Sequence, residues 1–290
     1  MDDGVTTRLG ENHFHMTTTT GGAAGALDWM EEWLQTEWPE LKVYLTSVTE
    51  EWSVATLSGP NAGKILKAAG VDISLDPADF PFMTMREAHI AGLPVRIFRI
   101  SFTGELSYEI NIRARHGLAL WTHLMKAGAE FGITPYGTEA MHVLRAEKGF
   151  IIVGQETDGS VTPQDLGMDW IVSKVKPDYI GKRALERASM AADNRKQLVG
   201  LRTKERKQVI PEGAHAVLDP NQPMPMDMLG QVTSSYYSPN VGSSIAMAML
   251  KGGRALMGGT VYLPMLDGSV IEAEVVEPIF YDPKGERLNG

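Results

Sequence analysis

The amino-acid sequence predicts an α+β fold with helices and mixed or antiparallel sheets, followed by a C-terminal β-barrel-like domain. Three observations support this prediction. Apolar residues recur at helical spacing over residues 23–36 and 116–131. Residues 92–112 alternate as a long strand hairpin with a glycine turn. From residue 196 onward, clusters of glycine, proline and aspartate separate short β-like runs at barrel-like intervals.

The elements of the first part follow in order along the chain. An alternating run on each side of Gly10 predicts a hairpin. Leu27, Met30 and Leu34 share one helical face, and Gly132 is a suitable residue to end a later helix. We expect helices over 23–36, 61–69, 116–131 and 137–148, and strands over 41–48, 52–57 and 92–112. We place one domain at 1–192 and a second at 193–290.

Composition excludes several classes of function. The chain has 290 residues, a hydrophobic content of 43% and a formal net charge of -9, which argues against binding to nucleic acid or to an anionic membrane. It has no cysteine, so disulfides, thiolate metal sites and cysteine nucleophiles are excluded. His13 and His15 lack an obvious third ligand, and we predict no metal. The sequence shows no signal peptide and no membrane-spanning run, so we expect a cytoplasmic protein.

Two adjacent carboxylates near the start of the chain are candidates for chemistry. Asp2 and Asp3 precede Gly4, and such a sequence is commonly a solvated turn. In a cleft, one of the two carboxylates could instead stabilise a developing cationic amine. The residues alone leave both interpretations open.

A strand carboxylate is the second candidate. The alternation places Tyr108, Ile110 and Ile112 on one face of a strand and Glu109 on the other. An exposed glutamate on a polar face is the simpler interpretation. However, a rigidly held carboxylate also suits the edge of a pterin or purine, because its two oxygens can accept two adjacent N–H groups at once.

A lone arginine is the third candidate. Arg145 lies among the apolar Met141, Val143, Leu144 and Ala146 of a predicted helix. If that face is buried, the guanidinium needs a carboxylate partner. If it is exposed, the side chain lies along the surface with its stem packed.

Several segments occur in a characteristic order along the chain: Met1-Asp2-Asp3-Gly4-Val5-Thr6, Leu57-Ser58-Gly59-Pro60-Asn61-Ala62, Ser101-Phe102-Thr103-Gly104-Glu105, Leu144-Arg145-Ala146-Glu147-Lys148-Gly149, Gly154-Gln155-Glu156-Thr157-Asp158 and Gly230-Gln231-Val232-Thr233-Ser234-Ser235-Tyr236. Their sequences and order resemble the aminomethyltransferase family, which includes the glycine cleavage T-protein. The resemblance covers nearly the whole chain. Within the family, the sequence of residues 148–159 is most similar to the sarcosine oxidase alpha-subunit branch.

This resemblance implies a T-protein-like folate-binding domain with a tetrahydrofolate site. Glu109 is expected to hold the pterin edge with Arg145 in support, and Asp3, rather than Asp2, to act in catalysis near the reacting nitrogens. Asp2, Tyr108 and Tyr236 are expected to line the folate. The implied reaction captures the one-carbon unit derived from an N-methyl amine as 5,10-methylenetetrahydrofolate.

The resemblance also implies partners and alternatives. A flavoprotein partner subunit is expected to oxidise the amine, with flavin and NAD on other parts of the complex. Family members carry sequence before the Asp-Asp segment, so the N-terminal part of the folate domain is expected to be missing here. The alternatives are a glycine cleavage T-protein acting on a lipoyl-borne aminomethyl group, and a non-catalytic folate-binding accessory subunit.

Overall fold

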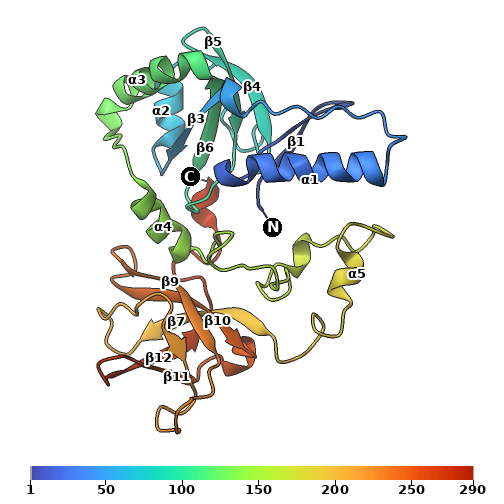
Figure 1. Cartoon of the computed structure of the whole chain (residues 1–290). Helices are drawn as coiled ribbons and strands as arrows, with labels where there is room; N and C mark the ends of the chain where they lie inside the picture. The colour runs from blue at the N-terminus through green and yellow to red at the C-terminus, as the bar shows by residue number, and fades with distance from the viewer. Residues whose placement is uncertain (1, 290) are drawn as a thin grey trace. The chain divides into compact units, whose positions relative to one another are not determined.

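The computed structural model describes residues 2–289, so Met1, the first residue of the Asp-Asp segment, lies outside the described residues. The chain forms two compact units (Figure 1). The first runs to Pro135 and includes the short segment from Gly285, and the second is Tyr136–Lys284. These units are defined by spatial contacts, whereas the domains 1–192 and 193–290 are defined from sequence patterns. The domain boundary at 192/193 stays a prediction.

The first unit is built on a four-stranded antiparallel sheet. Its strand order is β3 (Trp52–Ser58), β6 (Ser107–Arg113), β5 (Leu93–Phe98) and β4 (Met85–Ile90). The core-facing residues of β6 are buried with α2 (Ala62–Ala68) and α3 (Gly117–Ala127), which lie on the same side of the sheet (Figure 1). The hairpin predicted over 92–112 is confirmed, since β5 and β6 pair antiparallel.

The start of the chain adds a hairpin and a helix to this unit. β1 (Thr6–Gly10) pairs with β2 (His13–Met16), and α1 covers Ala23–Thr36, as the sequence predicts. The ring of His15 lies 6.1 Å from that of Phe98 and 6.2 Å from that of Trp52, measured between ring centroids. His15 therefore packs the hairpin onto the sheet face that does not carry the helices.

The strand predicted over residues 41–48 is wrong. These residues form no strand, and Leu41, Val43 and Tyr44 are 50%, 48% and 96% exposed. Their apolar alternation resembles that of a strand, but no neighbouring strand pairs with them to satisfy the backbone. The alternation of apolar residues therefore predicts a strand where none forms.

The second unit contains a closed sheet. The strand order is β11 (Thr260–Pro264), β12 (Val270–Val276), β7 (Lys196–Thr203), β10 (Ser243–Lys251), β9 (Gly230–Ser238) and β8 (His215–Ala216). Just after β8, Val217 exchanges backbone hydrogen bonds of 2.8 and 3.0 Å with Tyr262 of β11. These bonds join the two edge strands, so the predicted C-terminal barrel is confirmed.

Strand β10 shows how its sequence suits the barrel. Ala246, Ala248 and Leu250 belong to one buried cluster of the barrel, whereas Met247 belongs to a second cluster that includes Ala146 of α4 (Thr138–Glu147). Because both faces are covered, the strand is apolar rather than alternating. Small alanines alternate with methionines to match the two layers.

The remaining elements are short. α5 covers Lys182–Leu185. None of the helices within residues 2–289 has both the length and the apolar character that a membrane span requires. Short 3₁₀ helices cover Thr20–Gly22, Thr49–Glu51, Ala114–His116, Ala129–Phe131, Asp169–Ile171, Gly253–Leu256 and Glu286–Asn289.

Gly230 provides a test of strand packing in the barrel. A Cβ atom there would lie 1.9 Å from the carbonyl oxygen of Met249 on the paired strand. We expect Gly230→Ala to lower the free energy of unfolding by about 2 kcal/mol, measured by scanning calorimetry. Gly25→Ala is the control, because a Cβ there meets nothing within 4 Å and alanine favours α1 by about 0.5–1 kcal/mol. Equal stability of the two variants would contradict this account.

Candidate functional site

Glu109 is a partly buried carboxylate without a partner. It pairs across the sheet with Thr56 of β3 and Phe98 of β5, so these residues share its face. Among residues 2–289 its carboxylate makes no hydrogen bond or ion pair. Burial raises its pKa above the ordinary value. Both oxygens are therefore available to accept hydrogen bonds from a ligand.

The surroundings of Glu109 combine aromatic rings with open surface. Phe98 is buried beneath the ring of His15, and Trp52 lies at the other end of the same face with the guanidinium groups of Arg96 and Arg113 over its ring. Thr56 is exposed on the same face. His15, Arg96 and Arg113 cover these rings, so the open part of the face next to Glu109 lies at Thr56.

The two acidic residues at the start of the chain differ in their contacts. Asp2 Oδ1 accepts the backbone N–H groups of Asp3 at 2.9 Å and Thr19 at 3.3 Å. Burial of Asp2 raises its pKa, but hydrogen bonds from Thr19 and from the Asp3 backbone outweigh burial, and the pKa is lowered. A Cβ atom on Gly22 would collide with Oδ2 of Asp2. Asp2 therefore ties the chain start to the turn before α1.

Asp3 has no such ties. Its side chain is exposed, and none of the hydrogen bonds described for residues 2–289 uses its carboxylate. Partial desolvation raises the pKa of Asp3, and the charge of Asp2 raises it further. A free carboxyl group with a raised pKa is better suited to proton transfer than the fixed carboxylate of Asp2.

Tyr108 lies on the opposite side of the sheet from Glu109. Its side chain is 1% exposed, belongs to the apolar core and has its ring 6.0 Å from that of Phe80. Successive strand residues point to opposite faces, so the structure does not bring Tyr108 together with Glu109. Its role as a folate contact stays a prediction.

In the second unit, Arg145 is fully buried and paired. Its Nη1 donates to Oε2 of Glu156 at 2.9 Å and to the carbonyl oxygen of Phe150 at 3.0 Å, while Nη2 donates to Gln155 Oε1 at 3.3 Å and to Ser234 Oγ at 2.5 Å. Both Arg145 and Glu156 have no exposed side-chain surface. The carboxylate partner expected for a buried Arg145 is therefore Glu156.

Tyr236 on β9 lies beside this network. The pKa of its hydroxyl is raised, mainly by burial and also by the charge of Glu212, although the nearby Arg145 and Gln155 side chains act in the opposite direction. Gln155 also donates to the carbonyl oxygen of Thr233 at 2.9 Å. The structure thus brings Arg145 and Tyr236 together, as two members of one polar network on the barrel.

Sequence reasoning missed three members of this network: Gln155, Glu156 and Ser234. A buried arginine requires a carboxylate, and Glu156 lies in the Gly154–Asp158 segment that carries the resemblance. That requirement could have identified it. Nothing local marks Ser234, because its partner is 89 residues away along the chain.

Two family models match successive parts of the chain. The family model described as the GCVT N-terminal domain matches residues 1–176, and that of the glycine cleavage T-protein C-terminal barrel domain matches residues 196–282. The chain belongs to the glycine cleavage T-protein family. Aminomethyltransferase T from Bartonella henselae has the same fold, with a TM-score of 0.80 and 24% identity over 97% of this chain and 72% of that one.

Relatives within the T-protein family include longer proteins. The sarcosine oxidase alpha subunit of Corynebacterium sp. (strain P-1) is 49% identical over the whole of this chain, which spans 30% of that subunit. Human mitochondrial dimethylglycine dehydrogenase is 32% identical over 95% of this chain and 31% of its own length. The aminomethyltransferase of Halothermothrix orenii is 28% identical over 96% of this chain and 73% of its own length.

The buried Arg145–Glu156 pair can be tested by a double-mutant cycle. Either Arg145→Met or Glu156→Gln leaves a buried partner uncompensated, so each should lower the free energy of unfolding by roughly 3–5 kcal/mol. The loss in free energy of unfolding of the double variant should be smaller than the sum of the two single losses, and the difference should exceed about 1 kcal/mol. Lys204→Gln, which breaks an exposed 3.1 Å pair with Glu272, should cost under about 1 kcal/mol. Additive losses would contradict the coupling.

Glu109 should reduce stability at neutral pH. Its pKa is raised in the folded chain above the ordinary 4.5, so stability falls as pH rises from that value through the folded-state pKa. Glu109→Gln should therefore be more stable than the unsubstituted chain by about 1 kcal/mol near pH 7.5 and equal near pH 4. Denaturant unfolding at both pH values measures this. Glu130→Gln, at an exposed position, should show no such difference.

Proposed function

We propose that the chain is the tetrahydrofolate-binding one-carbon acceptor domain of a sarcosine oxidase-like complex. The unpaired, partly buried carboxylate of Glu109 is the observation that carries this proposal. Identity of 49% to a protein named sarcosine oxidase subunit alpha supports the choice of complex.

Glu109 suits the pterin edge of a folate. That edge presents two adjacent N–H donors, and the two free oxygens of one carboxylate can accept both. Phe98 and Trp52 share the sheet face with Glu109, so the carboxylate stands on a face with apolar residues beneath it, where hydrogen bonds to a ligand are strengthened. Arg145 and Tyr236 stay in the proposal as folate-site residues of the second unit, and Tyr108 and Asp2 as lining residues.

The chemistry asks for positioning more than for a strong catalyst. Reduced folate supplies two nucleophilic nitrogens: the first adds to the iminium carbon, and the second then displaces the amine, which leaves protonated with the two folate N–H protons, to give 5,10-methylenetetrahydrofolate. An iminium derived from an N-methyl amine is already electrophilic, so holding the reactants together provides most of the acceleration. Asp3 stabilises the cationic amine through its carboxylate and moves protons near it, consistent with its free side chain and raised pKa.

The proposal includes partners outside this chain. A flavoprotein partner subunit would oxidise the amine, with flavin and NAD on other parts of the complex, and a cytoplasmic location is part of the same proposal. The chain spans about 30% of the sarcosine oxidase alpha subunits it matches. The complete complex, rather than this chain, would carry out the oxidation.

A second candidate function is that of a glycine cleavage T-protein. It is favoured by the match to aminomethyltransferases, of which the chain covers 73% in the Halothermothrix orenii protein. Formation of methylenetetrahydrofolate from an aminomethyl-lipoyl carrier, without a flavoprotein, would support this candidate. A non-catalytic accessory subunit would bind folate with neither donor reacting.

Folate binding tests the main proposal. We expect saturable binding of tetrahydrofolate by calorimetric titration under anaerobic conditions. Glu109→Gln should weaken it roughly 10- to 100-fold, because a charged acceptor of two hydrogen bonds is lost. Glu130→Gln removes an exposed charge from the same unit and should bind normally. Unchanged binding by Glu109→Gln would overturn the assignment of this residue.

A further inference from the structure

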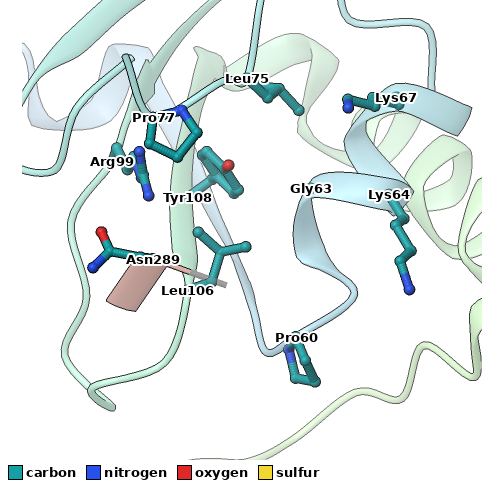
Figure 2. Close-up of a pocket in the computed structure, with 10 residues that line it drawn as sticks. All are labelled: Pro60, Gly63, Lys64, Lys67, Leu75, Pro77, Arg99, Leu106, Tyr108 and Asn289. Carbon is teal, nitrogen blue, oxygen red and sulfur yellow. The ribbon is translucent and has the colours of Figure 1, made fainter. Parts of the chain in front are cut away.

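A second polar hollow lies on the helix side of the sheet in the first unit. Arg99, Tyr108, Asn289 and two lysines of α2, Lys64 and Lys67, contribute to its lining (Figure 2). None of its lining residues is an aspartate or a glutamate. Three cationic side chains therefore contribute to one hollow that no carboxylate of residues 2–289 lines, in a chain whose formal net charge is -9.

Arg99 is the deepest of these cations. Its side chain is 1% exposed, and its Nη atoms donate only to backbone carbonyl oxygens, at 2.6 Å to Phe80 and 3.4 Å to Leu288. Its Nε is buried and has no hydrogen-bond partner. Among residues 2–289 no carboxylate pairs with Arg99. A buried guanidinium that lacks a counter-charge is costly, so an anion from solution would offset that cost.

Tyr108 supplies a neutral donor next to Arg99. Its hydroxyl makes no hydrogen bond among the described residues, although the side chain is 1% exposed. It reaches toward Gly63 of α2, where a Cβ atom would lie 3.7 Å from the hydroxyl oxygen. Figure 2 shows α2 at Gly63 facing the side of the hollow that carries Tyr108 and Leu106. Because Gly63 has no side chain, the space next to the hydroxyl on this side is left unfilled.

The lysines complete the charge at the mouth. Lys64 donates to Asn61 Oδ1 at 3.1 Å, which uses one of its three N–H groups, and Lys67 is exposed. Together with Arg99 they carry three positive charges. A ligand with a single negative charge would leave most of this charge uncompensated, whereas a dianion with several acceptor oxygens matches it better.

We propose that this hollow binds a phosphate dianion, either free or as the monoester of a small molecule. Arg99 and Tyr108 would contact its inner oxygens, and Lys64 and Lys67 would neutralise its outer charge. The hollow lies on the sheet face opposite to Glu109, because Tyr108 and Glu109 are successive residues of β6. The proposal does not depend on folate binding.

The test is a titration of the whole chain with inorganic phosphate, followed by calorimetry and by phosphorus NMR line width at constant ionic strength. We expect saturable binding with a Kd on the order of 1 mM or below. Lys64→Gln combined with Lys67→Gln should weaken it roughly tenfold. Lys126→Gln, at an exposed position of α3 outside the hollow, should not change it. Glycerol 3-phosphate in a parallel titration distinguishes a monoester from free phosphate.

Gly63→Ala keeps the test independent of folding. The added methyl group meets Tyr108 at ordinary contact distance and favours the helix, so the variant should be as stable as the unsubstituted chain or more stable. It should nevertheless bind phosphate several-fold more weakly, because the methyl group narrows the approach to the hydroxyl. Heats of phosphate binding no larger than those of acetate would overturn the proposal. So would a phosphate affinity equal to that of the unsubstituted chain in both the Gly63→Ala variant and the double lysine variant.

Discussion

The buried charge of Arg145 is the constraint on which the second unit depends. A guanidinium without exposed surface needs acceptors close by, and the two Nη atoms of Arg145 find them in Glu156, Ser234 and the Phe150 carbonyl oxygen, whereas its buried Nε has none. Glu156 in turn accepts the N–H of Ile152 at 2.7 Å. One ionic group therefore fixes α4, the turn after it and strand β9 relative to one another within this unit.

The charged residues that follow Arg145 extend the same design. Glu147 accepts hydrogen bonds from Ser238 at 2.6 Å and from Asn240 at 2.9 Å, and Lys148 pairs with Asp282 at 2.9 Å. Gly149, with φ of 68°, turns the chain where the carbonyl oxygen of Pro278 leaves no space for a Cβ atom. The Leu144–Gly149 segment thus joins helix to barrel mainly through polar contacts, which demand defined partners in a way that apolar packing does not.

This polar design explains how far the sequence could predict the structure. Local patterns identified α1, α3 and the β5–β6 hairpin, because helical and strand periodicities follow from burial of one face. They also indicated that Arg145 needs a carboxylate. They could not identify Ser234 as its neighbour, since that contact exists only after the barrel forms. The error at 41–48 has the same origin, because a strand requires a partner that the pattern does not contain.

The candidate site shows the same limit at the scale of a single strand. The alternation of β6 correctly assigns Tyr108 and Glu109 to opposite faces, yet the family resemblance groups them in one site. The structure gives each residue a different environment: Tyr108 shares a cationic hollow with Arg99, whereas Glu109 makes no hydrogen bond or ion pair among residues 2–289. The two faces of a strand have separate surroundings. One strand can therefore present a carboxylate on one face and contribute to an anion-binding hollow on the other. Glu109 supplies negative charge to one face, and Arg99 offers positive charge to the other.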